Sequence, residues 1–137
     1  GAFVGKGRVA VPDADHYAID GTLHQRADGK LFFLWSGRER SETGPQNIYI
    51  APMSDPWTIS GPRVRLSTPD HAWEQHGWHV NEGPEVLVRE GRTFVIYSGS
   101  GFTTPEYSLG LLTNGDGDLL NPASWSKAAT PVFTALE

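Results

Sequence analysis

The hydrophobic positions of the chain fall into short runs separated by glycine, proline and charged residues. This pattern is typical of β-strands joined by tight turns. The clearest run is KLFFLWSG, from Lys30 to Gly37, in which aromatic and branched residues are almost continuous. So few polar positions predict a strand that is covered on both faces. The one helix candidate, from Ala72 to His79, contains glycine and irregularly spaced aromatic residues, which favour a loop.

The strand pattern occurs twice along the chain. The segment from Asp20 to Gly37 aligns without a gap with the segment from Glu82 to Gly99, at a constant offset of 82 − 20 = 62 residues. The alignment places Asp20 on Glu82 and pairs most of the apolar positions that follow. Self-similarity at a fixed spacing is the signature of a repeat architecture.

Each repeat predicts four antiparallel strands. The predicted strands are 21–26, 30–37, 46–53 and 63–68 in the first repeat, and 84–89, 92–99, 107–114 and 130–135 in the second. The dipeptides Asp28-Gly29 and Glu90-Gly91 predict two-residue hairpin turns between the first two strands. The segments around Trp57 and Trp125 are interpreted as loops in which a tryptophan caps the edge of the sheet.

These units predict an all-β fold made of two four-stranded antiparallel blades of a β-propeller, with blade-like repeats at about 17–72 and 79–137. A β-sandwich is the alternative, and the repeat disfavours it. Because propellers close with about four to eight blades, two blades leave apolar faces open. We therefore expect missing blades or self-association to cover these faces.

Composition and charge exclude several classes of protein. The 16 glycines and 10 prolines are scattered between apolar runs, as in all-β chains. A net charge of −5 with dispersed basic residues argues against a nucleic-acid partner. No apolar run approaches the roughly 20 residues of a membrane span, and the N-terminus lacks the apolar core of a signal peptide. Without cysteine, redox chemistry gives no evidence of the compartment, so secreted and cytoplasmic locations both stay open.

Two acidic residues, Asp20 and Glu82, stand where the first strand of each repeat begins. Because the first strand of a propeller blade lines the central axis, we expect both carboxylates at the mouth of one cavity. Neighbouring carboxylates perform glycoside hydrolysis, one protonating the leaving oxygen and another activating water. An acid before glycine is also a common turn residue or cap, so this simpler interpretation stays open.

Aromatic side chains and histidines are further candidates for a site. Sugar sites carry aromatic platforms, and the predicted substrate-binding residues are Trp35, Trp78 and Tyr97. The three histidines between His71 and His79 lack the spacing of a zinc site. The segment TNGDGDL lacks the closing glutamate of a calcium loop. We therefore expect no metal site and no cofactor.

Several motifs together resemble glycoside hydrolase family 43, and within it the α-L-arabinofuranosidase branch. They are, in order, YAIDGTL, DGKLFFLWSG, VNEGPEVL, TFVIYSGSG and NPASWSKAATPVF. The resemblance implies a five-bladed propeller that removes arabinofuranosyl units from arabinan or arabinoxylan with inversion. It implies that Glu82, in the Glu-Gly-Pro motif, is the general acid. It also implies that Asp20, in the Ile-Asp-Gly motif, tunes the pKa of that acid and holds it in place.

The resemblance places the general base, an aspartate, in a first blade upstream of this chain. Asp13 and Asp15 do not stand at its position. The chain thus resembles blades two and three only, and we expect little or no activity from it alone. Two alternatives stay open: a carbohydrate-binding propeller piece without catalysis, and a half-propeller that self-assembles.

Overall fold

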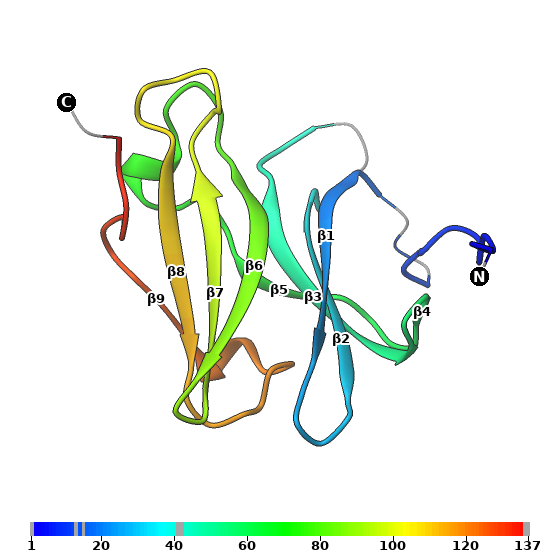
Figure 1. Ribbon diagram of the computed structural model, residues 1–137. Helices are drawn as coiled ribbons and strands as arrows, with labels where there is room; N and C mark the ends of the chain where they lie inside the picture. The colour runs from blue at the N-terminus through cyan, green and yellow to red at the C-terminus, as the bar shows by residue number, and fades with distance from the viewer. Residues whose placement is uncertain (1, 13, 15, 41–42, 136–137) are drawn as a thin grey trace.

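The computed structural model describes residues 2–12, 14, 16–40 and 43–135. Within these ranges the strands form two antiparallel sheets that lie side by side (Figure 1). The helical elements are two short 3-10 turns, η1 (Ala72–Glu74) and η2 (Pro122–Ser124). The structure confirms the predicted all-β fold of blade-like antiparallel sheets.

The first sheet contains β1 (Ala18–Gln25), β2 (Leu31–Gly37) and β3 (Asn47–Asp55) in that order. Two short strands share the position beyond β3: β4 (Thr58–Ile59) pairs with its end and β5 (Val64–Ser67) pairs with its beginning. The sheet is thus four strands wide.

The strand predicted at 63–68 is confirmed by β5, whereas β4 lies in a segment that was predicted to be a loop. The side chain of Asp55 explains the difference, because it accepts a hydrogen bond from the Trp57 N–H at 3.0 Å. This contact closes a tight turn that returns the chain against β3.

The second sheet follows the order β6 (Asn81–Arg89), β7 (Arg92–Gly99), β8 (Ser108–Asn114) and β9 (Trp125–Lys127). The prediction of a fourth strand at 130–135 is wrong, because β9 occupies this position and the later segment forms one isolated bridge to β8.

The placement of β9 has a local cause. The Asn121 side chain caps η2 by accepting from the Ala123 N–H at 3.1 Å, and Pro122 begins the turn. Trp125 then packs at the end of β8 while its indole N–H donates to the Leu119 carbonyl at 3.1 Å. This tryptophan belongs to a strand instead of capping the sheet edge from a loop.

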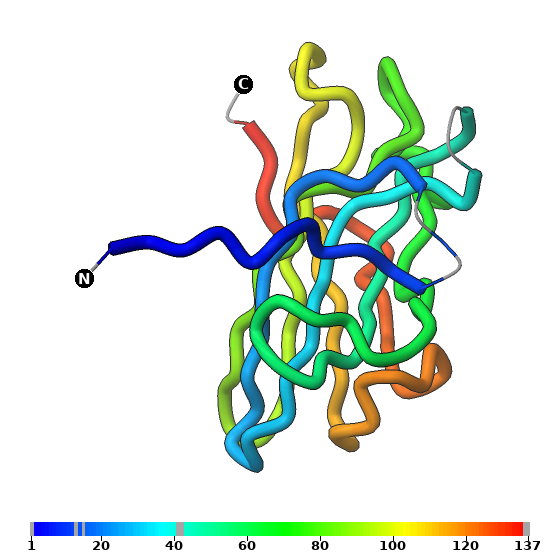
Figure 2. The backbone as a smooth tube through the Cα atoms, turned by 90° about the vertical axis from the view of Figure 1, so that its right-hand side faces the viewer, coloured from blue at the N-terminus to red at the C-terminus, as the bar shows by residue number. Residues whose placement is uncertain are grey.

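The main core lies between the two sheets. Its buried members are Phe32, Leu34, Ile48 and Ile50 from the first sheet and Val95, Tyr97, Leu112 and Leu119 from the second sheet and the loop after β8. A second core covers the opposite face of the first sheet, where Val9 and Val11 pack against a cluster around Trp35. Figure 2 shows the N-terminal segment running across this face. Strand β2 is therefore buried on both faces, as its continuous apolar run predicts.

The opposite face of the second sheet carries exposed apolar side chains. Leu87 pairs with Phe94 on the face directed away from the first sheet, and Leu87 is 54% exposed. Phe133, which bridges Leu109 of β8, is 66% exposed. That a further blade or a second copy of the chain covers this face stays a prediction.

The two inner hairpins differ in length by one residue. The β6–β7 turn consists of Glu90 and Gly91, both with positive φ, which matches the predicted two-residue turn. The β1–β2 connection instead has three residues, 27–29, because the Arg26 N–H donates to the Lys30 carbonyl across it. The prediction of a two-residue turn is wrong for this first hairpin.

The extra loop residue shifts the register of β1 relative to β6. Ser36 pairs with Ile19, whereas the equivalent Ser98 pairs with Glu82. Glu82 thus occupies the register position of Ile19, one residue from Asp20. The alignment predicted that the two acids occupy equivalent positions. This prediction is wrong by one residue.

Candidate active site

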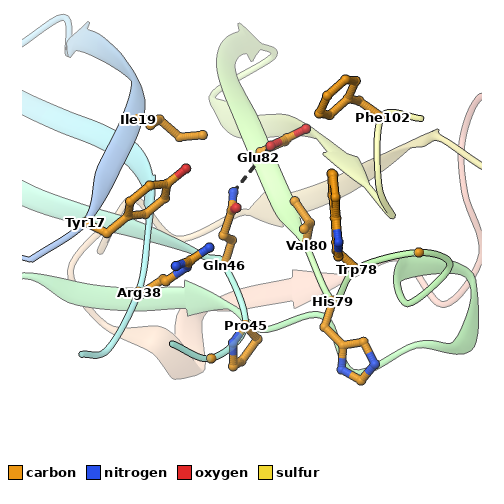
Figure 3. A pocket seen from close by; sticks show the side chains of 12 residues that line it. Tyr17, Ile19, Arg38, Pro45, Gln46, Trp78, His79, Val80, Glu82 and Phe102 are labelled. Carbon is orange, nitrogen blue, oxygen red and sulfur yellow. Dashed lines mark hydrogen bonds between the residues drawn. The ribbon is translucent and has the colours of Figure 1, made fainter. Parts of the chain in front are cut away.

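A pocket with a volume of about 660 Å³ lies at the junction of the two sheets (Figure 3). Its walls come from the beginning of β1, the β2–β3 connection, the segment before β6, β6 itself and the loop after β7. The lining residues are Tyr17, Ile19, Arg38, Gly44, Pro45, Gln46, Gly77, Trp78, His79, Val80, Glu82 and Phe102. Glu82 is the one acidic residue among these described lining residues.

A β-bulge on β6 places Glu82. The residue pairs with Ser98, and regular pairing resumes only at Glu85, which leaves Gly83 and Pro84 outside the ladder. Gly83 has a φ of +59°, a conformation that glycine adopts without steric cost. Bulges commonly redirect a side chain next to an active site. The Glu-Gly-Pro sequence therefore serves to present Glu82 where β6 enters the pocket.

Both carboxylate oxygens of Glu82 accept a hydrogen bond. The Tyr107 hydroxyl donates to Oε1 at 3.0 Å, and the Gln46 side-chain amide donates to Oε2 at 3.3 Å. Burial is the largest cause that raises the pKa of Tyr107, and the hydrogen bond to Glu82 and the charges of Glu82 and Asp20 act in the same direction. Tyr107 therefore keeps its proton, and its role as a donor, at neutral pH.

Gln46 is fixed by its backbone as well as by its side chain. Its N–H donates to the His79 carbonyl at 3.1 Å, and its carbonyl accepts from the Asn81 N–H at 2.9 Å, which joins the two sheets. Its amide also donates to the Ser36 hydroxyl at 3.2 Å. Through Gln46, the first sheet thus provides the hydrogen-bond donor to Oε2 of Glu82. Nothing in the sequence marked Gln46 or Tyr107 as site residues.

Asp20 contacts the strand that carries Glu82. Its Oδ2 accepts a hydrogen bond from the Gly83 N–H at 3.1 Å. Asp20 lies in the bulge of β1 and has a φ of +55°, which is uncommon for a residue other than glycine. Strain of this kind concentrates at functional sites. The structure thus brings Asp20 beside Glu82, although Asp20 is not among the residues that line the pocket.

The three aromatic residues predicted to bind substrate lie in different environments. Trp78 lines the pocket and is 54% exposed. Trp35 is 3% exposed, stacked between Phe33 and Tyr49 in the core outside the first sheet. Tyr97 is fully buried between the sheets. A sugar does not reach a buried ring, so the substrate-binding assignments of Trp35 and Tyr97 are corrected to core packing.

A buried ionic network contacts β6, the strand that carries Glu82, and its neighbour β7. Glu74 is completely buried, and its Oε1 accepts from the Asn81 amide at 2.8 Å and from the Tyr97 hydroxyl at 2.9 Å. Its Oε2 accepts from the His71 N–H at 2.9 Å and from the Lys127 ammonium at 2.8 Å. These four contacts satisfy the charge inside the protein, as a buried carboxylate requires.

The network has consequences for its titratable members. Burial, followed by the charge and hydrogen bond of Glu74, raises the pKa of Tyr97 far above its usual range. Burial alone would raise the pKa of Asp70, but the hydrogen bond and charge of Lys127 at 2.6 Å hold it below the ordinary value. The hydrogen bond from its side-chain amide anchors Asn81, the residue before Glu82, to the buried Glu74 carboxylate. Sequence patterns did not reveal this network, because Tyr97 and Lys127 lie 23 and 53 positions from Glu74 along the chain.

The residues at 2–12, 14, 16–40 and 43–135 provide no other candidate for a metal or membrane site. There, no group of three histidine, cysteine, aspartate or glutamate side chains is placed to hold a metal ion. Among the helices of the same ranges, none has the length and apolar character needed to cross a membrane. Asp13 and Asp15, which do not match the position of the base in the resemblance, lie outside the described residues.

Two antiparallel blades with an acid presented at their junction define a β-propeller module. The chain belongs to the Glycosyl hydrolases family 43, whose sequence profile matches residues 1–137. "Alpha-L-arabinofuranosidase 43" of Humicola insolens is 43% identical over 123 residues, which are 88% of this chain and 25% of that protein.

Two further proteins are similar in sequence or structure. The "Extracellular exo-alpha-(1->5)-L-arabinofuranosidase" of Streptomyces chartreusis is 38% identical over 122 residues, which are 88% of this chain and 37% of that protein. The crystal structure of an α-L-arabinofuranosidase from Lactobacillus brevis superposes with a TM-score of 0.86 at 44% identity, covering 95% of this chain and 39% of that one. The chain thus spans between 25% and 39% of the length of these relatives.

Proposed function

We propose that this chain forms part of an inverting glycoside hydrolase that removes arabinofuranosyl units from arabinan or arabinoxylan. Glu82 is the general acid, and Asp20 is its modulator. The observation that carries the proposal is the pocket itself: Glu82 lines it, and donors from both sheets hold its two oxygens. The similarity to three arabinofuranosidases supports the choice of sugar.

The geometry supports a simple role for Glu82. In its protonated form the carboxyl group donates its proton to the glycosidic oxygen as the bond to the anomeric carbon breaks. A water molecule attacks that carbon from the opposite face and loses its proton to a general base. Inverting enzymes hold the two carboxyl groups about 6.5–9.5 Å apart, which leaves room for the water.

The second carboxylate of this mechanism is not found at the described part of the pocket, where Glu82 is the one acidic lining residue. We place the general base outside this chain. Without a base the attacking water is not activated, and the rate falls by roughly 10²- to 10⁴-fold. The chain on its own is thus expected to have little or no hydrolase activity.

The stereochemistry of the product tests the proposal. The full-length protein is incubated with α-linked arabino-oligosaccharides, and the first sugar released is followed by proton NMR before it mutarotates. Inversion predicts β-arabinofuranose as the first product. Initial release of the α anomer, or no hydrolysis of arabinan and arabinoxylan fragments, would contradict the proposal.

A carbohydrate-binding role without catalysis is the second candidate. It is favoured by the single carboxylate among the described lining residues. This function predicts that arabino-oligosaccharides bind to the full-length protein in calorimetry while no reducing sugar is released over long incubation. Turnover by the wild-type protein that disappears in the Glu82→Gln variant would exclude it.

A further inference from the structure

We propose that Tyr107 is a positioning residue for the general acid, which ensures that the proton of Glu82 resides on Oε1 and leaves from there. The Tyr107 hydroxyl donates to this oxygen when Glu82 is ionised and turns its own proton away when Oε1 is protonated. The role in hydrolysis rests on the proposed function. The choice of oxygen rests on the hydrogen bonds around the carboxyl group.

The Gln46 amide is a fixed donor to the other oxygen. Its Nε2 lies 3.3 Å from Glu82 Oε2 (Figure 3) and 3.2 Å from the Ser36 hydroxyl. The Ser36 hydroxyl donates its one proton to the Asn81 carbonyl at 2.8 Å, so towards Gln46 it only accepts. The amide group facing Ser36 is therefore the NH2, and an amide turned with its oxygen towards Glu82 is excluded. A proton on Oε2 would weaken this bond, because a hydroxyl oxygen is a poorer acceptor than a carbonyl oxygen.

The Tyr107 hydroxyl, in contrast, is able to donate or to accept. It carries one proton and two lone pairs, and the proton rotates about the C–O bond to suit its partners. The Ser98 side chain is a second hydrogen-bond partner of this hydroxyl, and Ser98 pairs with Glu82 across the ladder. When Oε1 is protonated, Tyr107 directs its proton to Ser98 instead. Oε1 is therefore the oxygen that takes up a proton without opposing a fixed donor.

The backbone around Tyr107 holds the hydroxyl in place. The Tyr107 N–H donates to the Thr104 carbonyl at 3.3 Å, directly before β8 begins. Thr104 is itself held by the Gly101 carbonyl, which accepts from its N–H and from its hydroxyl, both at 2.9 Å. Tyr107 is not among the described residues that line the pocket. It thus acts on the carboxyl group without occupying the space of the sugar.

The cleavage step uses both orientations of the hydroxyl. The proton moves from Oε1 of Glu82 to the glycosidic oxygen as the bond between this oxygen and the anomeric carbon breaks, and the electron pair of that bond stays on the leaving oxygen. Tyr107 turns back and donates to Oε1 while this atom becomes a carboxylate oxygen. Tyr107 keeps its own proton, because burial raises the pKa of its hydroxyl. A hydrogen bond that forms as the proton leaves stabilises the transition state more than the ground state.

Other ionisable groups also influence the ionisation of Glu82. Asp20 contacts the backbone beside it, and the pocket is lined by Tyr17, Arg38 and His79. A negative charge at Asp20 favours the protonated carboxyl group, whereas positive charges at Arg38 and on a protonated His79 favour the carboxylate. These groups are the same in the wild type and in variants of Tyr107 or Gln46. Differences between such variants therefore report the two hydrogen bonds.

A pH titration of the Glu82 carboxyl group in the full-length protein tests the inference. Carbon-13 NMR of labelled glutamate follows this group, and Glu82→Gln assigns the signal. In Tyr107→Phe the carboxylate loses a donor, so the titration midpoint is expected to rise by about one pH unit. In Gln46→Met the rise is expected to be smaller, because this donor contacts Oε2 in both protonation states.

Tyr49→Phe is the matched control. The Tyr49 hydroxyl is buried in the core outside the first sheet and accepts from the Asn47 amide at 3.3 Å, so its loss is expected to leave the midpoint of Glu82 unchanged.

The kinetics of Tyr107→Phe distinguish positioning from a merely structural role. On arabino-oligosaccharides the alkaline limb of the pH–rate profile is expected to move to higher pH, since the general acid stays protonated further up the scale. The turnover number is expected to fall about tenfold with little change in KM, because Tyr107 does not line the pocket. A residue that only supported the fold would leave the position of this limb unchanged.

The outcomes separate this inference from the proposed function. An unchanged midpoint in Tyr107→Phe, or a larger rise in Gln46→Met, would overturn the inference even if the wild type hydrolyses arabinan. If Tyr107→Phe unfolds, 3-fluorotyrosine in place of Tyr107 is the second test. Its more acidic hydroxyl is a stronger donor, so the midpoint is expected to fall, and a midpoint that did not fall would contradict the inference. If the midpoints move as expected but the wild type hydrolyses nothing, the proposed function fails and the position of the proton stands.

Discussion

Asp20 of β1 accepts a hydrogen bond from the Gly83 N–H of β6 at 3.1 Å, so one acid fixes the backbone next to the other. Both residues have positive φ values, +55° for Asp20 and +59° for Gly83. Each sits in a β-bulge, and the bulges face each other across the junction of the two sheets. The orientation of Glu82 therefore depends on a contact between the sheets as well as on its own strand.

The Asp20→Asn variant separates the charge of Asp20 from its hydrogen bond. The asparagine amide oxygen still accepts from the Gly83 N–H, so the fold and the thermal midpoint are expected to stay near those of the wild type. The turnover number of the full-length protein is expected to fall about tenfold or more, because the negative charge beside the acid is lost. Full activity with asparagine at this position would show that only the hydrogen bond matters.

Replacing Gln46 with methionine removes the donor to Glu82 Oε2 while keeping the length of the side chain. A hydrogen bond to a charged group contributes about 1.5–3 kcal/mol, so activity on oligosaccharides is expected to fall roughly 10- to 100-fold. Steady-state kinetics measure this effect. Gln75→Met is the control, because the Gln75 amide donates to the Pro69 carbonyl at 2.9 Å, away from the pocket. Equal activity of the two variants would remove Gln46 from the site.

Lys127→Met leaves the buried carboxylate of Glu74 without its cationic partner. Breaking a buried pair in this way costs about 3–5 kcal/mol of unfolding free energy. Urea unfolding measures the loss. In the double variant Glu74→Gln with Lys127→Met the buried charge is gone and only the exposed Asp70 loses its partner, so much of the loss is expected to be recovered. A single variant as stable as the wild type would refute the structural role of the pair.

His24 makes the stability of the chain depend on pH. The side chain is 8% exposed, and within the described structure its Nε2 has no hydrogen-bond partner. Burial, and then the charge of Arg26, lower its pKa below the ordinary value of 6.5. The unfolded chain therefore takes up a proton more readily than the folded one, and the contribution of His24 to stability, complete above pH 6.5, is lost as the pH falls below it.

His24→Phe tests this dependence by keeping an aromatic ring that does not titrate. Unfolding free energies of wild type and variant are compared at pH 7 and at pH 5. The wild type is expected to lose more stability between the two values than the variant does. Parallel losses would show that His24 is not the group responsible.

The sequence predicted the repeated units of the fold but not their exact pairing. Alternating and continuous apolar runs placed six of the longer strands, since burial in a sheet requires such patterns. The alignment without gaps concealed the extra residue of the loop at 27–29, because Asp28-Gly29 and Glu90-Gly91 look alike in sequence. The consequence was a one-residue error in the equivalence of Asp20 and Glu82.

The site was predictable only as far as local motifs define it. Glu82 and Trp78 were found from sequence and line the pocket. Trp35 and Tyr97 were wrongly assigned to the substrate site. Strands β2 and β7 are apolar on both faces, so the sequence pattern does not show that these two rings are buried. Gln46 was missed because its role arises from the packing of two sheets, which leaves no pattern along the chain.

The most direct test of the account is the Glu82→Gln variant of the full-length protein, assayed on two substrates. Arabino-oligosaccharides have poor leaving groups, and their turnover is expected to fall by roughly 10²- to 10⁴-fold when the general acid is removed. α-L-Arabinofuranosyl fluoride releases fluoride without protonation and is expected to show a much smaller loss. Wild-type turnover of the oligosaccharides, or an equal loss on both substrates, would contradict the assignment of Glu82 as the general acid.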